Sequence, residues 1–92
     1  MKSSSLNKCA AVLKILGNTK RLEILYNISD KELNVGQLER TVKLSQSALS
    51  QHLAVLRKAG IVNTRRSAQT IFYSLNDPNV IQILDIIGKL YS

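Results

Sequence analysis

The sequence predicts a mainly α-helical domain with one small β-hairpin, in the order α-α-α-α-β-β-α. Most of the chain repeats its apolar residues at helical spacing, whereas residues 62–75 alternate with the period of two that is typical of strands. Residues that favour N-caps precede the expected helices. The 92 residues suit one small domain, and a hydrophobic fraction of 45% is too high for a disordered chain.

Two helices open the chain. The first is expected over about 5–16, because apolar residues recur there at helical spacing and a glycine follows. Asn18 or Thr19 then caps a second helix, whose first turn carries Lys20 and Arg21. The helix macrodipole disfavours cations at this end. The two side chains therefore predict a site for an external anion.

The next two helices are joined by a tight turn. Asn34 and Gln37 form an N-x-x-Q capping box that starts the third helix. Ser45 caps the fourth helix, expected over about 46–59, only two residues after the third helix ends. Two short helices joined so closely form a helix-turn-helix pattern, here over about 35–59.

The fourth helix has two distinct faces. Leu49, Leu53 and Leu56 form one narrow apolar stripe. The opposite face is small and polar and carries no acid, which suits a helix that enters a DNA groove and meets base edges and phosphates. This outer face holds Ser47, Ser50, Gln51, Ala54 and Lys58.

Residues 62–75 predict a hairpin, or wing, in which Ile71, Tyr73 and Leu75 share one face. Its tip lacks the Asn-Gly or Asp-Gly pair that favours a tight two-residue loop. We therefore expect a mobile tip that presents Arg65 and Arg66.

The last helix, expected over about 78–91, is apolar nearly all round. Asp77 suits its N-cap and Pro78 its first position. A chain of this size has little with which to cover such a helix, so we expect a homodimer that pairs the first and last helices. A tightly wrapped core helix in a monomer is the alternative. The expected interface residues are Leu6, Leu13, Ile83, Ile86, Ile87, Leu90 and Tyr91.

The net charge of +7 is concentrated in the middle of the chain. No acidic residue lies between Glu39 and Asp77. A one-sided basic segment indicates a polyanionic partner, either nucleic acid or an anionic membrane. A membrane site would need bulky apolar anchors that the helix-turn-helix core already uses, so we expect double-stranded DNA and no membrane. The bases of this segment are Arg40, Lys43, Arg57, Lys58, Arg65 and Arg66.

No catalytic, metal or cofactor site is expected. The acids are scattered and there is no glycine-rich phosphate loop, which argues against an enzyme. His52 and Cys9 are the only histidine and cysteine, so no cluster has metal-ligand spacing. A single cysteine cannot form an internal disulfide, and no apolar run is long enough to span a membrane, so we expect a cytoplasmic protein.

The run LSQSALSQHLAVLRKAGIV, from Leu44 to Val62, and the hairpin ending Tyr-Ser-Leu resemble the ArsR/SmtB family of bacterial winged helix-turn-helix repressors. The similarity extends over nearly the whole chain. It implies dimers that bind operator DNA, here a palindrome, and release it when a metal or redox signal arrives. By position, the resemblance implies groove contacts from Gln46, Ser47, Ser50 and Gln51 and wing contacts from Arg65 and Arg66. Further candidate DNA contacts are Lys20, Arg21, His52, Arg57 and Lys58.

The sensing sites that the family implies do not match this chain. The cysteine motif of the metal sensors aligns with residues 32–38, which contain no cysteine, and the last helix has no histidine for zinc. The chain is most similar to the sulfide and persulfide sensors, whose two cysteines align with Tyr26 and Ser92. We therefore expect a regulator without a dithiol switch.

Two alternatives to this interpretation remain. We expect Cys9 to be a buried, inert thiol on the apolar side of the first helix, but a redox signal could act through it. A winged helix that binds only proteins is the other alternative, because fold alone does not determine function. It predicts acids or exposed large apolar residues on the outer face of the fourth helix.

Overall fold

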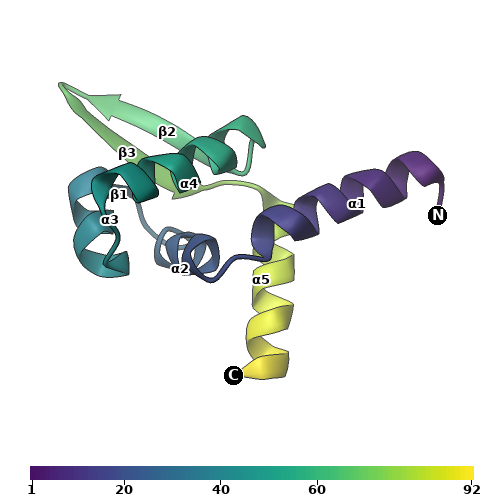
Figure 1. Cartoon of the computed structure of the whole chain (residues 1–92). Helices are drawn as coiled ribbons and strands as arrows, with labels where there is room; N and C mark the ends of the chain where they lie inside the picture. Colours follow the sequence, from purple (N-terminus) through teal and green to yellow (C-terminus); the bar gives the residue numbers. More distant parts are fainter.

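Five helices and a small sheet make up the chain, and the computed structural model describes all residues 1–92 (Figure 1). The mainly α-helical class with a hairpin before the last helix is confirmed. The elements are α1 (Ser3–Leu16), α2 (Thr19–Asn27), β1 (Leu33–Asn34), α3 (Val35–Val42), α4 (Gln46–Lys58), β2 (Val62–Ser67), β3 (Thr70–Leu75) and α5 (Pro78–Tyr91).

The sheet has one strand more than the sequence predicted. The two residues of β1 pair antiparallel with β3, so that Leu33 lies opposite Tyr73 and Asn34 opposite Phe72, and the strand order is β1-β3-β2. The order of elements is therefore α-α-β-α-α-β-β-α. Two residues are too few to show the alternation that identifies a strand in a sequence. Only the pairing with β3 makes this segment a strand.

The core lies where α2, α3 and α4 meet the inner face of the sheet. All fifteen buried residues are hydrophobic. The expected stripe of Leu49, Leu53 and Leu56 is buried, as are Tyr73 and Leu75 from the hairpin. This packing anchors α4 by one face and leaves its opposite face to the solvent.

The helix starts follow the cap residues seen in the sequence. The Asn34 side chain accepts a hydrogen bond from the Gln37 amide at 2.9 Å, and the Gln37 side chain accepts one from the Asn34 amide at 2.8 Å. The Ser45 hydroxyl accepts from an amide in the first turn of α4, and the Asp77 carboxylate does the same for α5. Asn18, rather than Thr19, caps α2. These bonds satisfy amides that a helix start otherwise leaves unpaired.

The hairpin turn is tighter than expected. Ser67 lies opposite Thr70, so only Ala68 and Gln69 form the loop. Ala68 takes a left-handed conformation, with φ of 56°. Two-residue hairpin turns that fit the strand twist need positive φ at this position, which glycine or asparagine normally supplies. Here an alanine fills that role, so a two-residue loop forms without the Asn-Gly or Asp-Gly pair.

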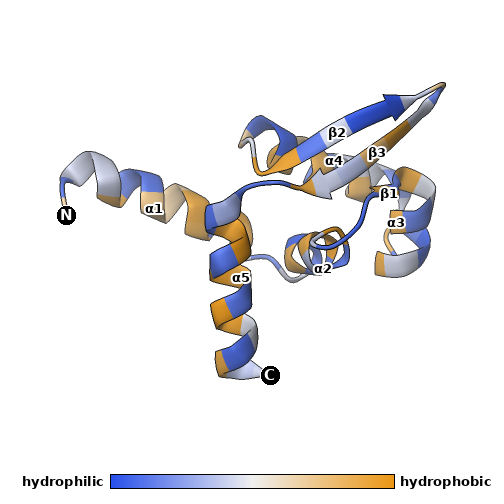
Figure 2. Ribbon diagram, turned by 180° about the vertical axis from the view of Figure 1, so that it is seen from behind, coloured by the Kyte–Doolittle hydropathy of each residue, from blue (hydrophilic) through white to orange (hydrophobic).

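The two terminal helices project from the body of the molecule (Figure 1). α1 buries only Leu16, and α5 buries only Val80 and Leu84. Apolar residues appear along the remaining length of both helices (Figure 2). The molecule measures 44 × 29 × 22 Å along its principal axes. None of its helices combines the length and the apolar character that crossing a membrane requires.

Candidate nucleic-acid interface

The outer face of α4 is the first component of the site. The stripe of buried leucines holds one side of the helix, and the Ser45 cap fixes its start. The predicted polar set is fully on the other side, where every member is exposed and none is acidic. Small hydroxyl and amide side chains on a firmly anchored helix can enter a major groove and hydrogen-bond to base edges. The exposed set is Ser47, Ser50, Gln51, Ala54 and Lys58, and Gln46 in the first turn of α4 is exposed as well.

One exposed large apolar residue, Val55, lies on α4 outside this polar set. The residue is 38% exposed, but it lies off the small, polar outer face, to which the expectation of no large apolar residue applies. A single exposed valine is normal on a protein surface and does not amount to an apolar docking patch.

Lys20 and Arg21 are already occupied within the chain. The Lys20 ammonium donates to the carbonyl of Val42 at 2.9 Å, and the Arg21 guanidinium donates to the carbonyl of Ile15 at 2.6 Å. Both carbonyls lie in the last turns of neighbouring helices, where cations compensate unpaired carbonyls and the macrodipole. The Lys20 ammonium also lies 3.4 Å from a carboxylate oxygen of Glu23. Within the chain, the two cations expected to bind an external anion are therefore engaged by Glu23 and by carbonyls at the ends of α3 and α1.

His52 is directed toward α2 rather than toward solvent. It is half-buried, and its Nδ1 lies 3.5 Å from a guanidinium nitrogen of Arg21. Burial, and then the charge of Arg21, lower the pKa of the imidazole. A neutral histidine in this place packs against α2 and is separated from the exposed polar set of α4.

The two wing arginines lie in different environments. Arg65 forms a bidentate ion pair with Glu32 and stacks over Phe72, with 4.7 Å from the guanidinium carbon to the ring centroid. The hydrogen bond between Arg65 and Glu32 lowers the pKa of the carboxyl and raises the pKa of the guanidinium. Arg66 is exposed and forms no ion pair. The structure therefore leaves one free cation on the wing instead of two.

The turn of the helix-turn-helix adds a candidate that was not among the DNA contacts expected from the sequence. Lys43 is exposed at the end of α3, with φ of 53°, two residues before the cap of α4. Together with Arg57 and Lys58, which are exposed at the other end of α4, it flanks the polar face with positive charge. The acid-free basic segment already contained this lysine, but only the fold brings it beside α4.

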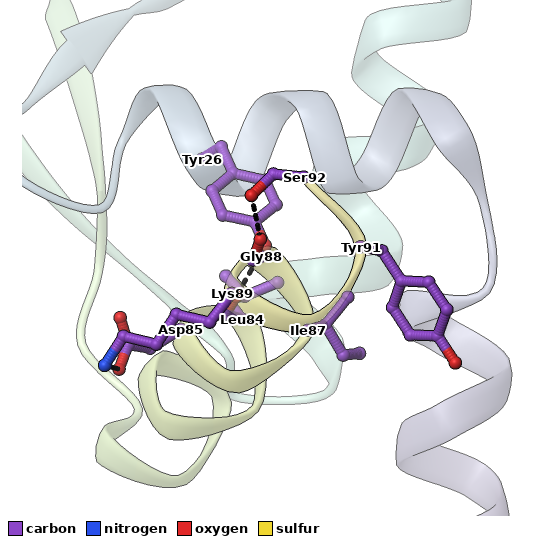
Figure 3. A pocket seen from close by; sticks show the side chains of 8 residues that line it. All are labelled: Tyr26, Leu84, Asp85, Ile87, Gly88, Lys89, Tyr91 and Ser92. Atoms are coloured by element: carbon purple, nitrogen blue, oxygen red, sulfur yellow. Dashed lines mark hydrogen bonds and ion pairs between the residues drawn. The ribbon is translucent and has the colours of Figure 1, made fainter.

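Tyr26 and Ser92 line one open groove between α2 and α5, of about 570 Å³ (Figure 3). The resemblance to the sulfide sensors implies cysteines at these two positions, and the fold brings the two positions together. The Tyr26 hydroxyl donates to the carbonyl of Leu84 at 2.6 Å, and the Ser92 hydroxyl donates to the carbonyl of Gly88. Neither side chain has the sulfur that a dithiol switch requires.

Cys9 is exposed, which corrects the expectation of a buried thiol. It lies on α1 beside a cavity of about 490 Å³ that Val12, Leu13 and Ile83 also line. The chain covers α1 only near its end, at Val12, Ile15 and Leu16, so residues earlier in the helix have no cover from their own subunit.

The family described as bacterial regulatory protein, arsR family, matches residues 18–64, which extend from the cap of α2 into β2. The chain belongs to the ArsR family. The matched segment contains the whole helix-turn-helix and the capping box. Named relatives of this ArsR-family chain are transcriptional regulators, so the chain is a DNA-binding transcriptional regulator with a winged helix-turn-helix fold and not an enzyme.

The relatives of this ArsR-family chain include both activators and repressors by name. The transcriptional activator HlyU of Vibrio cholerae is 49% identical over 84 residues, which cover 91% of this chain and 78% of the relative. The crystal structure of NolR from Sinorhizobium fredii has a TM-score of 0.90 at 41% identity, covering 99% of this chain and 94% of NolR. The crystal structure of the transcriptional repressor BigR from Xylella fastidiosa has a TM-score of 0.88 at 33% identity, covering 100% of this chain and 98% of BigR.

Proposed function

We propose that this regulator acts as a homodimer that binds a palindromic DNA operator through two copies of α4 and the wing. The observation that carries the proposal is the acid-free, fully exposed polar face of α4, flanked by unpaired cations. Such a face meets the requirements of a reading helix, because phosphate contacts fix its position and hydrogen bonds to bases select the sequence.

The proposed contacts divide into two kinds. Side chains in the first half of α4 read bases in the major groove: Gln46, Ser47, Ser50 and Gln51. Cations around them contact phosphates: Lys43, Arg57, Lys58 and Arg66. Lys20, Arg21, His52 and Arg65 are omitted from the proposed contacts, because each is engaged inside the chain.

The proposed dimer uses the exposed apolar residues of α1 and α5. A helix of 14 residues that buries one leucine is marginal in water by itself, so α1 needs further packing. A twofold contact between identical apolar faces supplies it for both subunits at once. Ile83 is half-buried, and the other proposed interface residues are exposed in the single chain: Leu6, Leu13, Ile86, Ile87, Leu90 and Tyr91.

We propose further that the dimer represses transcription by occupying DNA at or near a promoter in the cytoplasm. A dimer whose helices enter successive major grooves on one side of the duplex physically excludes other proteins from that stretch. A reporter gene placed behind the bound sequence tests this part. Repression lowers the reporter signal when the regulator is produced, and a rise identifies an activator instead.

The main test selects DNA from a random duplex library with the full chain and then measures binding to the enriched duplex. We expect an imperfect palindrome with half-sites about one helical turn apart, or a multiple of it. Ser47→Ala and Gln51→Ala should change the preference among sequences by about 1–3 kcal/mol for a lost base contact.

Gln82→Ala, an exposed glutamine on α5, is the matched control and should leave the preference unchanged. If the library yields no enriched sequence, or if both α4 variants select the same sequence as the original chain with the same affinity, α4 is not the reading helix. A module that binds only proteins would give the first of these results.

A further inference from the structure

The ion pair between Glu32 and Arg65 extends across the width of the sheet. Glu32 lies immediately before β1, Arg65 lies on β2, and Phe72 lies on β3 between them. The Arg65 Nε donates to both carboxylate oxygens, at 2.9 and 3.1 Å, and its Nη2 donates to one of them at 2.9 Å. The guanidinium therefore crosses the ring of Phe72 and joins the two edges of the sheet.

The wing has little other support. β1 pairs with β3 at only two positions, Leu33 with Tyr73 and Asn34 with Phe72. Beyond these positions β2 and β3 form a two-stranded ribbon, which by itself is marginally stable in water. The bidentate pair lies at the last position where the third strand still supports the ribbon.

The register places Arg65 and Arg66 on opposite faces of the ribbon. Arg65 is paired with Phe72, whereas Arg66 is paired with Ile71. Residues directly opposite each other in an antiparallel pair share a face, and successive residues alternate. Arg66 therefore lies on the face that Ile71 and the buried Tyr73 occupy, and Arg65 on the other. The two side chains therefore leave the ribbon in opposite directions.

We propose that Glu32 and Arg65 form a strut that positions the wing for DNA, and that Arg66 is the wing's phosphate contact. The strut fixes the direction in which the β2–β3 ribbon projects from the core. Arg66, which lies nearer the tip of the ribbon, contacts a phosphate of the DNA. The inference rests on the proposed DNA binding and deepens it, because it divides two adjacent arginines into a positioning residue and a contacting residue.

A different role for Glu32 makes the opposite prediction. If Arg65 were itself a phosphate contact that Glu32 masks, removal of the carboxylate would free a cation and strengthen binding. If the pair is a strut, removal of either partner releases the ribbon and weakens binding, although Glu32→Gln makes the chain more positive. The sign of the Glu32→Gln effect separates the two roles.

The experiment measures the dissociation constant for a mixed-sequence 30-base-pair duplex over a series of salt concentrations. The variants are Glu32→Gln, Arg65→Ala, Arg66→Ala and the exchange of the two charges, Glu32→Arg with Arg65→Glu. Asp30→Asn is the matched control. Asp30 lies two residues before Glu32 and forms no ion pair, so this variant removes the same negative charge without breaking the pair. Amide hydrogen exchange of the free chain reports the mobility of residues 66–71 in each variant.

The strut predicts that Arg66→Ala lowers the log–log salt slope of the dimer by about 1.8, the value for two phosphates at roughly 0.9 each. Glu32→Gln and Arg65→Ala should each leave the slope within about 0.5 of the value for the original chain and bind DNA about two- to fivefold more weakly. Their amide hydrogens at residues 66–71 should exchange faster. The exchanged pair should restore binding, whereas a direct phosphate contact by Arg65 could not survive its replacement by glutamate. Asp30→Asn should not weaken binding.

Two results overturn the strut: stronger binding by Glu32→Gln with a steeper slope, or a loss of slope in Arg65→Ala equal to that in Arg66→Ala. The strut is also overturned if amide hydrogen exchange at residues 66–71 is unchanged in both Glu32→Gln and Arg65→Ala. Failure of the proposed function looks different, because the original chain would then bind no duplex while the exchange result still tests the strut.

Discussion

Ala68 holds the hairpin turn in a conformation that suits glycine better. Its φ of 56° costs an L-residue roughly 1–2 kcal/mol, and part of this is recovered because alanine is less flexible than glycine in the unfolded chain. We expect Ala68→Gly to raise the free energy of unfolding by about 0.5–1 kcal/mol in urea titrations at fixed protein concentration. Ala54→Gly, in the middle of α4, is the control and should lower it by about 1 kcal/mol. Equal losses in both variants would mean that the turn is not strained.

His52 links stability to pH through its position beside Arg21. Burial and that charge lower the pKa of the folded imidazole below its ordinary 6.5, so the unfolded chain binds the proton more readily. Stability is therefore present above pH 6.5 and is lost as the pH falls below it. We expect the unfolding midpoint in urea to drop between about pH 7.5 and about pH 5.5. His52→Gln should reduce this drop, and an identical drop in the variant would assign it to other groups.

At the scale of elements, local sequence signals predicted where the helices start. They did not predict the features that depend on partners far away in the sequence. The Asn34 capping box and the Ser45 cap are formed by residues three apart, so the sequence contains both partners of each bond. The pairing of β1 with β3, and of Glu32 with Arg65, joins residues more than 30 positions apart. The strand period places Arg65 and Arg66 on opposite faces, but only the fold shows that Glu32 and Phe72 lie on the face of Arg65. The exposed face of α4 was predictable because one helical period determines it.

Tyr26 ties α2 to α5 through its hydrogen bond to the carbonyl of Leu84 (Figure 3). Gly88 leaves room for this contact, since a Cβ there would lie 3.3 Å from the tyrosine oxygen. Tyr26→Phe removes only the hydroxyl, and we expect a loss of about 1 kcal/mol in the free energy of unfolding. Tyr73→Phe removes a hydroxyl that forms no hydrogen bond within the chain and lies outside the proposed dimer interface, so it should not lower the free energy of unfolding. Equal effects of the two variants would show that the bond does not hold the helices together.

At the scale of the whole molecule, the acid-free basic surface and most of the exposed apolar surface lie on different elements. Exposed cations without acids among them surround α4 and the wing, whereas most of the exposed large apolar side chains lie on α1 and α5, although α1 also carries Lys8 and Lys14. The acid-free segment carries six of the thirteen bases, and the rest of the chain has nearly balanced charge. This division lets two copies meet through their terminal helices while both basic faces remain available to one duplex.

The salt dependence of DNA binding tests this division. Four proposed phosphate contacts in each subunit, Lys43, Arg57, Lys58 and Arg66, give a log–log slope near −7 for the dimer at roughly 0.9 per neutralised phosphate. Arg57→Gln should reduce the magnitude of the slope by about 1.8, whereas Lys2→Gln, which removes the same charge outside the basic face, should leave it unchanged. Fluorescence anisotropy over a salt series measures both. Equal reductions in the two variants would mean that net charge, rather than the basic face of α4, determines binding.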